Sequence, residues 1–382
     1  MCSSDLNPHM RGGAISTRRA FALGSVGAVI ASSAPRSFGQ LSPGRQLGPT
    51  VEPAAGKTVK VDLIAAERPC ALPCFGGAAL PLWTFSEKDW LPVIRLDLGD
   101  RLEATLRNRL GRKDESTSIH WHGIRLPNDQ DGVPFLVQPL VHPGESFRYA
   151  FEPPDTGTYF FHTHCNTAEQ LGRGLEGLLI VDGDVTEPYD ADVVLLMRDW
   201  HVDLSSGQFN PFFSLRGAGR AGSYGAVRSV NGATNPQIAL PSGGDCRVRL
   251  INSDPTRIMR VRIDGAEAAV VAIDGAAIPP FQPKAIVMGP AMRADLVLRA
   301  PEAGKIARLV DDSGGSDVQL ASFAGKGPLV RRTAFDPAPL RAPRIPQPDL
   351  GRARRFRLSL DRSEAGGLFA EPLDGKIGRA HV

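Results

Sequence analysis

The stretch "RLEATLRN", residues 101–108, alternates apolar and polar side chains with a period of two. Successive side chains of an extended chain point to opposite faces, so Leu102, Ala104 and Leu106 would share one face. The charged and hydroxyl side chains between them would share the other. This pattern predicts a β-strand with one face buried and the other in water.

Comparable patterns recur along the chain. "CRVRLIN" (246–252) alternates Val248 and Leu250 with two arginines, which again predicts a half-buried strand. "GLLIV" (177–181) and "VVLLM" (193–197) are continuous apolar runs, typical of strands covered on both faces. The 41 glycines and 32 prolines favour many turns, and no long amphipathic helix is evident. We therefore predict an all-β fold of β-sandwiches or Greek-key barrels.

The bulk composition is that of an ordinary globular protein. A chain of 382 residues has room for two or three domains, and a hydrophobic content of 42% supports buried cores. The formal net charge is only +3, and the basic residues form no single stripe. Nucleic acid is therefore not an expected partner.

Turn-rich junctions divide the chain into successive units. The first compact unit is expected over residues 56–183 and the second over residues 190–332. Residues 335–350 are rich in proline and should form a stiff, extended linker. A further strand pattern begins after the linker, so residues 351–382 are interpreted as the start of a third, incomplete domain.

Residues 1–40 are interpreted as a leader with an export signal. Arg18 and Arg19 precede an apolar stretch, residues 20–34, that is too short to span a bilayer. The paired arginines suggest the twin-arginine route and a periplasmic location, although a disordered basic tail is the alternative. No other stretch could cross a membrane, so no membrane association is expected after signal removal. Both ends of the sequence also look foreign to a natural chain.

The histidines are concentrated in two short motifs. "SIHWHGIRLPNDQDGVP" contains His120 and His122, and "GTYFFHTHC" contains His162 and His164, which together make half of the eight histidines. On a strand, side chains two residues apart lie on the same face, about 6.5–7 Å apart. Two such strands side by side would bring four imidazoles to one space. Neutral imidazole is the commonest metal ligand and suits zinc, copper, iron or nickel.

Several other metal sites use the same kind of histidine pair. One H-x-H on an exposed strand often has no function, but two pairs at this spacing favour a metal centre. Zinc hydrolases usually continue as H-x-H-x-D-H, whereas "GIRLP" follows His122 here. The repeating β-α units of metal-dependent barrel hydrolases are also missing.

The motifs resemble a known family. "SIHWHG", "DGVP", "GTYFFHTH" and "LGRGLEGLLIVD" strongly resemble the first cupredoxin domain of multicopper oxidases, the laccase-like family. "VNGATNPQIAL", "RVRLINSD" and "MRADLVLR" resemble the second domain of that family. The resemblance covers about residues 56–299. It implies tandem cupredoxin-like Greek-key domains that bind copper.

The resemblance also implies roles for individual residues. His120 matches a ligand of the type 2 copper, and His122, His162 and His164 match ligands of the type 3 coppers. Asp131 matches the acidic residue that assists proton delivery to the trinuclear copper cluster. The reaction so implied takes electrons from a small reducing substrate, such as a phenol, an aromatic amine or a cuprous ion, and reduces dioxygen to water. Asp131 is also a plausible turn former before Gly132.

Part of the family pattern has no match in this chain. In the family, the type 1 copper ligands and the remaining cluster histidines come from a C-terminal domain with an H-C-H motif, and nothing in this chain matches it. The chain is therefore expected to hold half of the trinuclear site and to be inactive as given. Cys165 follows His164 but is expected to line a loop beside the site, and His142 and His201 are expected to be structural or surface residues.

Two other functions remain open at this point. A copper-free scaffold protein of the same fold is one alternative, although such relatives lose the ligands that are intact here. Copper nitrite reductase, also built of cupredoxin domains, is the other, but H-W-H-G is not its ligand pattern. Cys70 and Cys74 could form a local disulfide in an oxidising compartment. The reducing substrate and the oligomeric state cannot be deduced from the sequence.

Overall fold

The structure, a computed structural model, describes most of the chain after the leader. The described ranges are 48–50, 56–185, 187–212, 224–331, 333–342, 349–354, 358–362 and 368–372. Two compact units are present, Met1–Arg344 and Ile345–Val382. The predicted signal at residues 18–34 lies outside the described residues. None of the described helices is long and apolar enough to cross a bilayer.

The first sandwich is built from eight strands of the first unit. These strands are β2 (Thr58–Cys70), β3 (Leu80–Thr84), β4 (Val93–Asp97), β5 (Arg101–Asn108), β6 (His120–His122), β7 (Ser146–Phe151), β8 (Gly157–His162) and β9 (Glu176–Asp182). One sheet has the order β3-β2-β5-β7 and the other the order β4-β9-β8-β6. Leu102, Ala104 and Leu106 of β5 are fully buried between these sheets, which confirms the predicted alternation.

The second sandwich follows along the chain. Its strands are β10 (Ala191–Trp200), β13 (Val227–Val230), β14 (Gln237–Pro241), β15 (Asp245–Asn252), β16 (Met259–Asp264), β17 (Ala268–Ile273), β18 (Ala276–Phe281), β19 (Ile286–Met288), β20 (Arg293–Arg299), β21 (Ile306–Asp311) and β22 (Val318–Lys326). One sheet has the order β13-β10-β15-β20-β17-β18 and the other β14-β22-β21-β16-β19. Val248, Leu309 and Phe323 belong to the core between them. The all-β prediction is thus confirmed, with two β-sandwiches in tandem.

The remaining elements are short. They are β1 (Gly48–Thr50), η1 (Pro73–Phe75), η2 (Asn128–Gln130), α1 (Thr167–Gly172), β11 (Val202–Asp203), β12 (Gln208–Phe209), β23 (Arg341–Ala342), β24 (Leu358–Arg362) and β25 (Leu368–Pro372). β1 pairs with β23 in parallel, and β24 pairs with β25 as a hairpin inside the second unit. The domain limits drawn from the sequence remain a prediction. Cys70 and Cys74 are free thiols in this structure.

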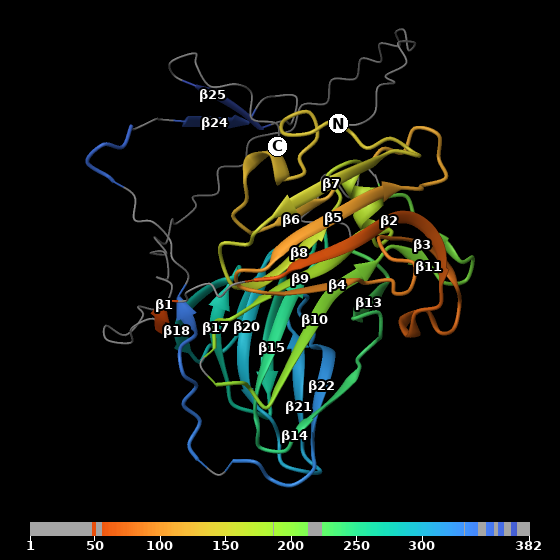
Figure 1. Cartoon of the computed structure of the whole chain (residues 1–382). Coiled ribbons are helices and arrows are strands. Elements are labelled where there is room, and N and C mark those ends of the chain that lie inside the picture. Colours follow the sequence, from red (N-terminus) through yellow and green to blue (C-terminus); the bar gives the residue numbers. More distant parts are fainter. Residues whose placement is uncertain are drawn as a thin grey trace, which may run out of the picture. The chain divides into compact units, whose positions relative to one another are not determined.

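The two sandwiches pack through one sheet of each. Figure 1 shows β4, β9 and β8 lying between the outer sheet of the first sandwich and the strands β10 and β15 of the second. Phe160 and Leu178 from the first sandwich form an apolar cluster with Leu196 and Ile251 from the second. The face of β8 and β9 that the first core does not use is therefore covered by the second sandwich, which is why these strands are apolar on both faces.

The arginines of β15 depart from the half-buried interpretation. Arg247 and Arg249 are each only 1% exposed, although their alternation with Val248 and Leu250 favoured a solvated face. Arg247 pairs with Asp184 at 2.7 Å and with Asp295 at 2.5 Å. Arg249 pairs with Asp192 at 2.7 Å. The polar face of this strand meets acidic groups at the junction of the sandwiches instead of water.

Candidate metal centre

Two neighbouring strands bring the histidines together. β6 pairs with β8 in antiparallel register, so that His120 lies opposite His162 and Trp121 lies opposite Phe161. Trp121 and Phe161 point into the first core, with ring centroids 5.1 Å apart. Because neighbouring residues of a strand alternate in direction, the histidines must point to the other face. The predicted shared face of His120 and His122 is confirmed.

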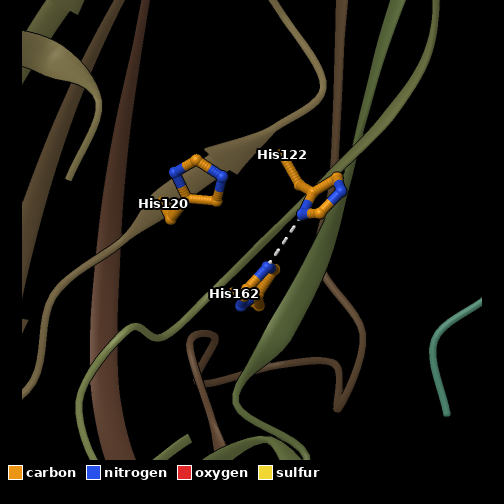
Figure 2. A group of neighbouring side chains, drawn as sticks. All are labelled: His120, His122 and His162. Carbon is orange, nitrogen blue, oxygen red and sulfur yellow. Dashed lines mark hydrogen bonds between the residues drawn. The ribbon is translucent and has the colours of Figure 1, made fainter. Parts of the chain in front are cut away.

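Three imidazoles form a compact group. The ligand atoms of His120, His122 and His162 all lie within 4.8 Å of one another. Figure 2 shows the three rings around a common space, with Nδ1 of His122 and Nε2 of His162 facing each other at 3.2 Å. Two nitrogens this close can both bind one ion, because twice a metal–imidazole distance of about 2.0–2.1 Å exceeds their separation.

His164 lies just past the end of β8. Its ring centroid is 5.1 Å from that of His120 and 6.1 Å from that of His162, and its side chain is exposed. His164, the fourth predicted histidine, is therefore next to the group of three imidazoles, on the side that faces solvent.

Backbone carbonyls fix the orientation of two rings. Nδ1 of His120 donates to the carbonyl oxygen of Asp131 at 2.8 Å, and Nδ1 of His162 donates to that of Thr163 at 2.8 Å. A carbonyl only accepts, so both Nδ1 atoms carry the proton and both Nε2 atoms keep a free lone pair. This arrangement is typical of metal-binding histidines, whose second nitrogen is held by a hydrogen bond.

One proton lies in the hydrogen bond between Nδ1 of His122 and Nε2 of His162. Because Nε2 of His162 has no proton, Nδ1 of His122 must donate the hydrogen bond between them. A metal ion that binds both nitrogens would replace this proton. The donor set, with nitrogen ligands alone and one exchangeable proton, fits a copper ion.

Burial keeps these rings neutral. Burial, followed by the charge of Arg293, lowers the pKa of His122 to about 3. Burial, followed by the charge of His120, lowers the pKa of His162 to about 3. The same two causes lower the pKa of His164. Neutral imidazole is the form that binds a metal, so these side chains are competent ligands at neutral pH.

The loop "DGVP" holds Asp131 beside the first histidine. Gly132 has a φ of +81°, and a Cβ at this position would lie 1.7 Å from the carbonyl oxygen of Ile119. Only glycine allows the loop to rest on the start of β6 in this way. Oδ1 of Asp131 is 3.5 Å from Nδ1 of His120, and the side chain is 35% exposed. The carboxylate is thus near the cluster and also in contact with water.

A buried glutamine, which the sequence interpretation missed, braces both histidine segments. Gln170 of α1 is fully buried, and its amide nitrogen donates to the Ser116 carbonyl oxygen at 2.8 Å. Its amide oxygen accepts from Thr163 at 2.5 Å and from Thr117 at 2.9 Å. The residue therefore ties the segment before His120 to the segment after His162. Nothing local in the sequence distinguishes it from a surface glutamine.

The other single candidates are placed as expected. Cys165 is fully buried beside the histidine loop, with Sγ 4.0 Å from the hydroxyl oxygen of Ser118. His142 is exposed, and Ser116 forms a hydrogen bond with its ring at 2.8 Å. His201 is half-buried at the end of β10. None of these three belongs to the group of converging imidazoles among the described residues.

Comparison with known proteins agrees with the fold. A family model described as multicopper oxidase matches residues 74–185. The multicopper oxidase MmcO of Mycobacterium tuberculosis is 29% identical over 322 residues, which cover 73% of this chain and 62% of that protein. Among solved structures, a multicopper oxidase from Pseudomonas thermotolerans is 38% identical with a TM-score of 0.72, covering 79% of this chain and 72% of that one. One from Pseudomonas parafulva is 36% identical with a TM-score of 0.68, covering 77% and 70%.

Tandem sandwiches with a cluster of imidazoles define a cupredoxin-like protein suited to a transition metal. The chain belongs to the multicopper oxidase family. The relatives named above are described as multicopper oxidases, so copper is the cofactor that membership implies. The matched region spans less than two thirds of the length of the mycobacterial relative.

Proposed function

We propose that the protein is a copper-dependent oxidase that couples the one-electron oxidation of a small substrate to the four-electron reduction of dioxygen to water. His120 would bind the type 2 copper, and His122, His162 and His164 would bind type 3 coppers. The observation that carries the proposal is the convergence of three ligand-competent imidazoles within 4.8 Å. Reducing substrates of the expected class are phenols, aromatic amines and cuprous ions.

The protein groups around the site have separable tasks. Bound copper would supply the one-electron redox chemistry. The carbonyls of Asp131 and Thr163 hold the rings of His120 and His162 in the ligand orientation. Gln170 keeps the two histidine segments in register. We further propose export to the periplasm by the twin-arginine route, on the strength of Arg18, Arg19 and the apolar stretch at residues 20–34.

Copper content and oxygen uptake of the complete protein test the proposal. The purified protein should contain copper and should consume oxygen when a phenol, an aromatic amine or a cuprous salt is added. Removal of copper by a chelator should stop the uptake, and copper should restore it. A protein that binds no copper and takes up no oxygen would instead be the copper-free scaffold, and the proposal would fail.

Asp131 is proposed to deliver protons to the site. Reduction of one dioxygen consumes four protons, and this carboxylate lies between solvent and His120. Asp131→Asn keeps the backbone carbonyl that orients His120 but cannot carry a proton. In the complete protein, we expect oxygen uptake to fall by roughly 100-fold while copper content is unchanged. Asp129→Asn, an exposed neighbour on η2, is the matched control and should keep the full rate. Equal rates for the two variants would rule out the proton-delivery role.

A further inference from the structure

An arginine of the second sandwich reaches the metal-binding strand of the first. Arg293 begins β20, and its side chain is only 4% exposed. Its Nε donates to the carbonyl oxygen of Thr158 on β8 at 3.3 Å. Its Nη1 donates to the Ala291 carbonyl oxygen at 2.8 Å and pairs with Asp274 at 3.1 Å. These contacts hold the guanidinium in one place.

The fixed guanidinium lies against the residue that follows His122. A Cβ on Gly123 would be 2.0 Å from Nη2 of Arg293, so a larger residue would collide with a side chain that cannot easily move. Gly123 also has a φ of +85°, which favours glycine. The glycine thus lets a buried cation come close to the backbone of a candidate ligand.

The charge of this arginine is only partly compensated. An arginine remains protonated when buried. Its partner Asp274 is 46% exposed, so water screens that carboxylate more than it screens the guanidinium. Nη1 faces Asp274, whereas Nη2 faces the glycine beside His122. The guanidinium is thus the charged group of this pair that lies beside the candidate ligand.

We propose that Arg293 is a positioning residue that raises the reduction potential of the copper ion held by His122 and His162. The inference rests on the proposed function, since it presumes copper at these rings. A nearby cation repels the doubly charged cupric ion more than the singly charged cuprous ion, because Coulomb energy scales with the product of the charges. The second sandwich thereby tunes a site whose described ligands all come from the first.

Separate affinities for Cu(I) and Cu(II) test this inference without any measurement of activity. Each is obtained by competition of the chain with a chelator specific for that oxidation state, at neutral pH. Arg293→Gln should strengthen Cu(II) binding relative to Cu(I) by about tenfold, which equals a fall in potential of about 59 mV for one electron. Arg293→Lys keeps the charge, so its ratio of Cu(II) to Cu(I) affinity should stay within about threefold of the wild-type ratio.

Two further variants separate charge from structure. Arg249→Gln removes another buried arginine of the same junction, one that donates to the hydroxyl of Thr158 at 2.9 Å, and should leave the Cu(I) to Cu(II) preference unchanged. Asp274→Asn removes the counter-charge and keeps the oxygen that accepts from the backbone N–H of Arg293 at 3.0 Å. It should shift the preference about threefold in the opposite direction, towards Cu(I).

The outcomes are distinguishable. Opposite shifts for Arg293→Gln and Asp274→Asn support the inference, because loss of packing would move both variants the same way. The inference is overturned if the ratio of Cu(I) to Cu(II) affinity in Arg293→Gln equals that of the wild type. It is also overturned if Arg293→Lys or Arg249→Gln changes this ratio as much as Arg293→Gln does. If Arg293→Gln does not fold, Asp274→Asn decides alone. The inference is then overturned if the preference of Asp274→Asn does not shift towards Cu(I). A wild-type chain that binds neither ion overturns the inference, whereas the proposed function fails only if the complete protein also binds no copper.

Discussion

His162→Ala should weaken copper binding by the chain by at least roughly 100-fold. Nε2 of His162 and Nδ1 of His122 are 3.2 Å apart, so the two rings are expected to share one ion. Loss of an outer-shell partner alone commonly costs about 10–100-fold in metal affinity, and loss of a direct ligand should cost more. Copper affinity, measured by competition with a chelator of known strength, checks this expectation.

A matched histidine provides the control for this substitution. His142 is exposed, and His142→Ala should bind copper as the wild type does. Thermal unfolding of both variants shows whether the fold is kept, because His162 is buried and also donates to the carbonyl of Thr163. A folded His162→Ala variant with unchanged copper affinity would remove His162 from the proposed ligand set.

Arg247→Met should lower the free energy of unfolding by about 3–5 kcal/mol, the usual cost of breaking a buried ion pair by removing one partner. The arginine is 1% exposed, and its carboxylate partners Asp184 and Asp295 are 5% and 2% exposed. Without the guanidinium, Asp184 loses the side chain that binds both of its oxygens, at 2.7 and 2.8 Å. Urea denaturation of the chain checks the loss.

Exposure decides the size of this effect. Arg101 also pairs with two acids, Glu103 at 3.8 Å and Glu152 at 3.5 Å, but its side chain is 43% exposed. Arg101→Met should change the free energy of unfolding by less than about 1 kcal/mol, because water screens surface pairs. If Arg247→Met cost no more than Arg101→Met, the buried charges at the junction of the sandwiches would not contribute to stability as described.

The parts of the fold that depend on local geometry could be predicted from the sequence. Alternation in residues 101–108 gives the buried face of β5, since strand periodicity needs no knowledge of distant residues. The same rule places His120 and His122 on one face. It does not apply to His162 and His164, because β8 ends at His162 and the second ring follows the strand.

The parts that depend on packing between sandwiches could not be predicted. Alternating arginines in β15 look the same whether their face meets water or, as with Arg247 and Arg249, the acids of another layer. Gln170 and Arg293 reach the histidine segments only through the folded chain, and neither stands in a motif. Their positions follow from how α1 and β20 are packed, which no local pattern encodes.

Diffraction from crystals of the copper-loaded chain, collected on both sides of the copper absorption edge, tests the metal centre most directly. An anomalous peak should lie about 2.0–2.1 Å from both Nδ1 of His122 and Nε2 of His162, as expected for first-row metals bound by imidazole. Copper peaks that avoid all of His120, His122, His162 and His164 would contradict a shared copper site at these histidines.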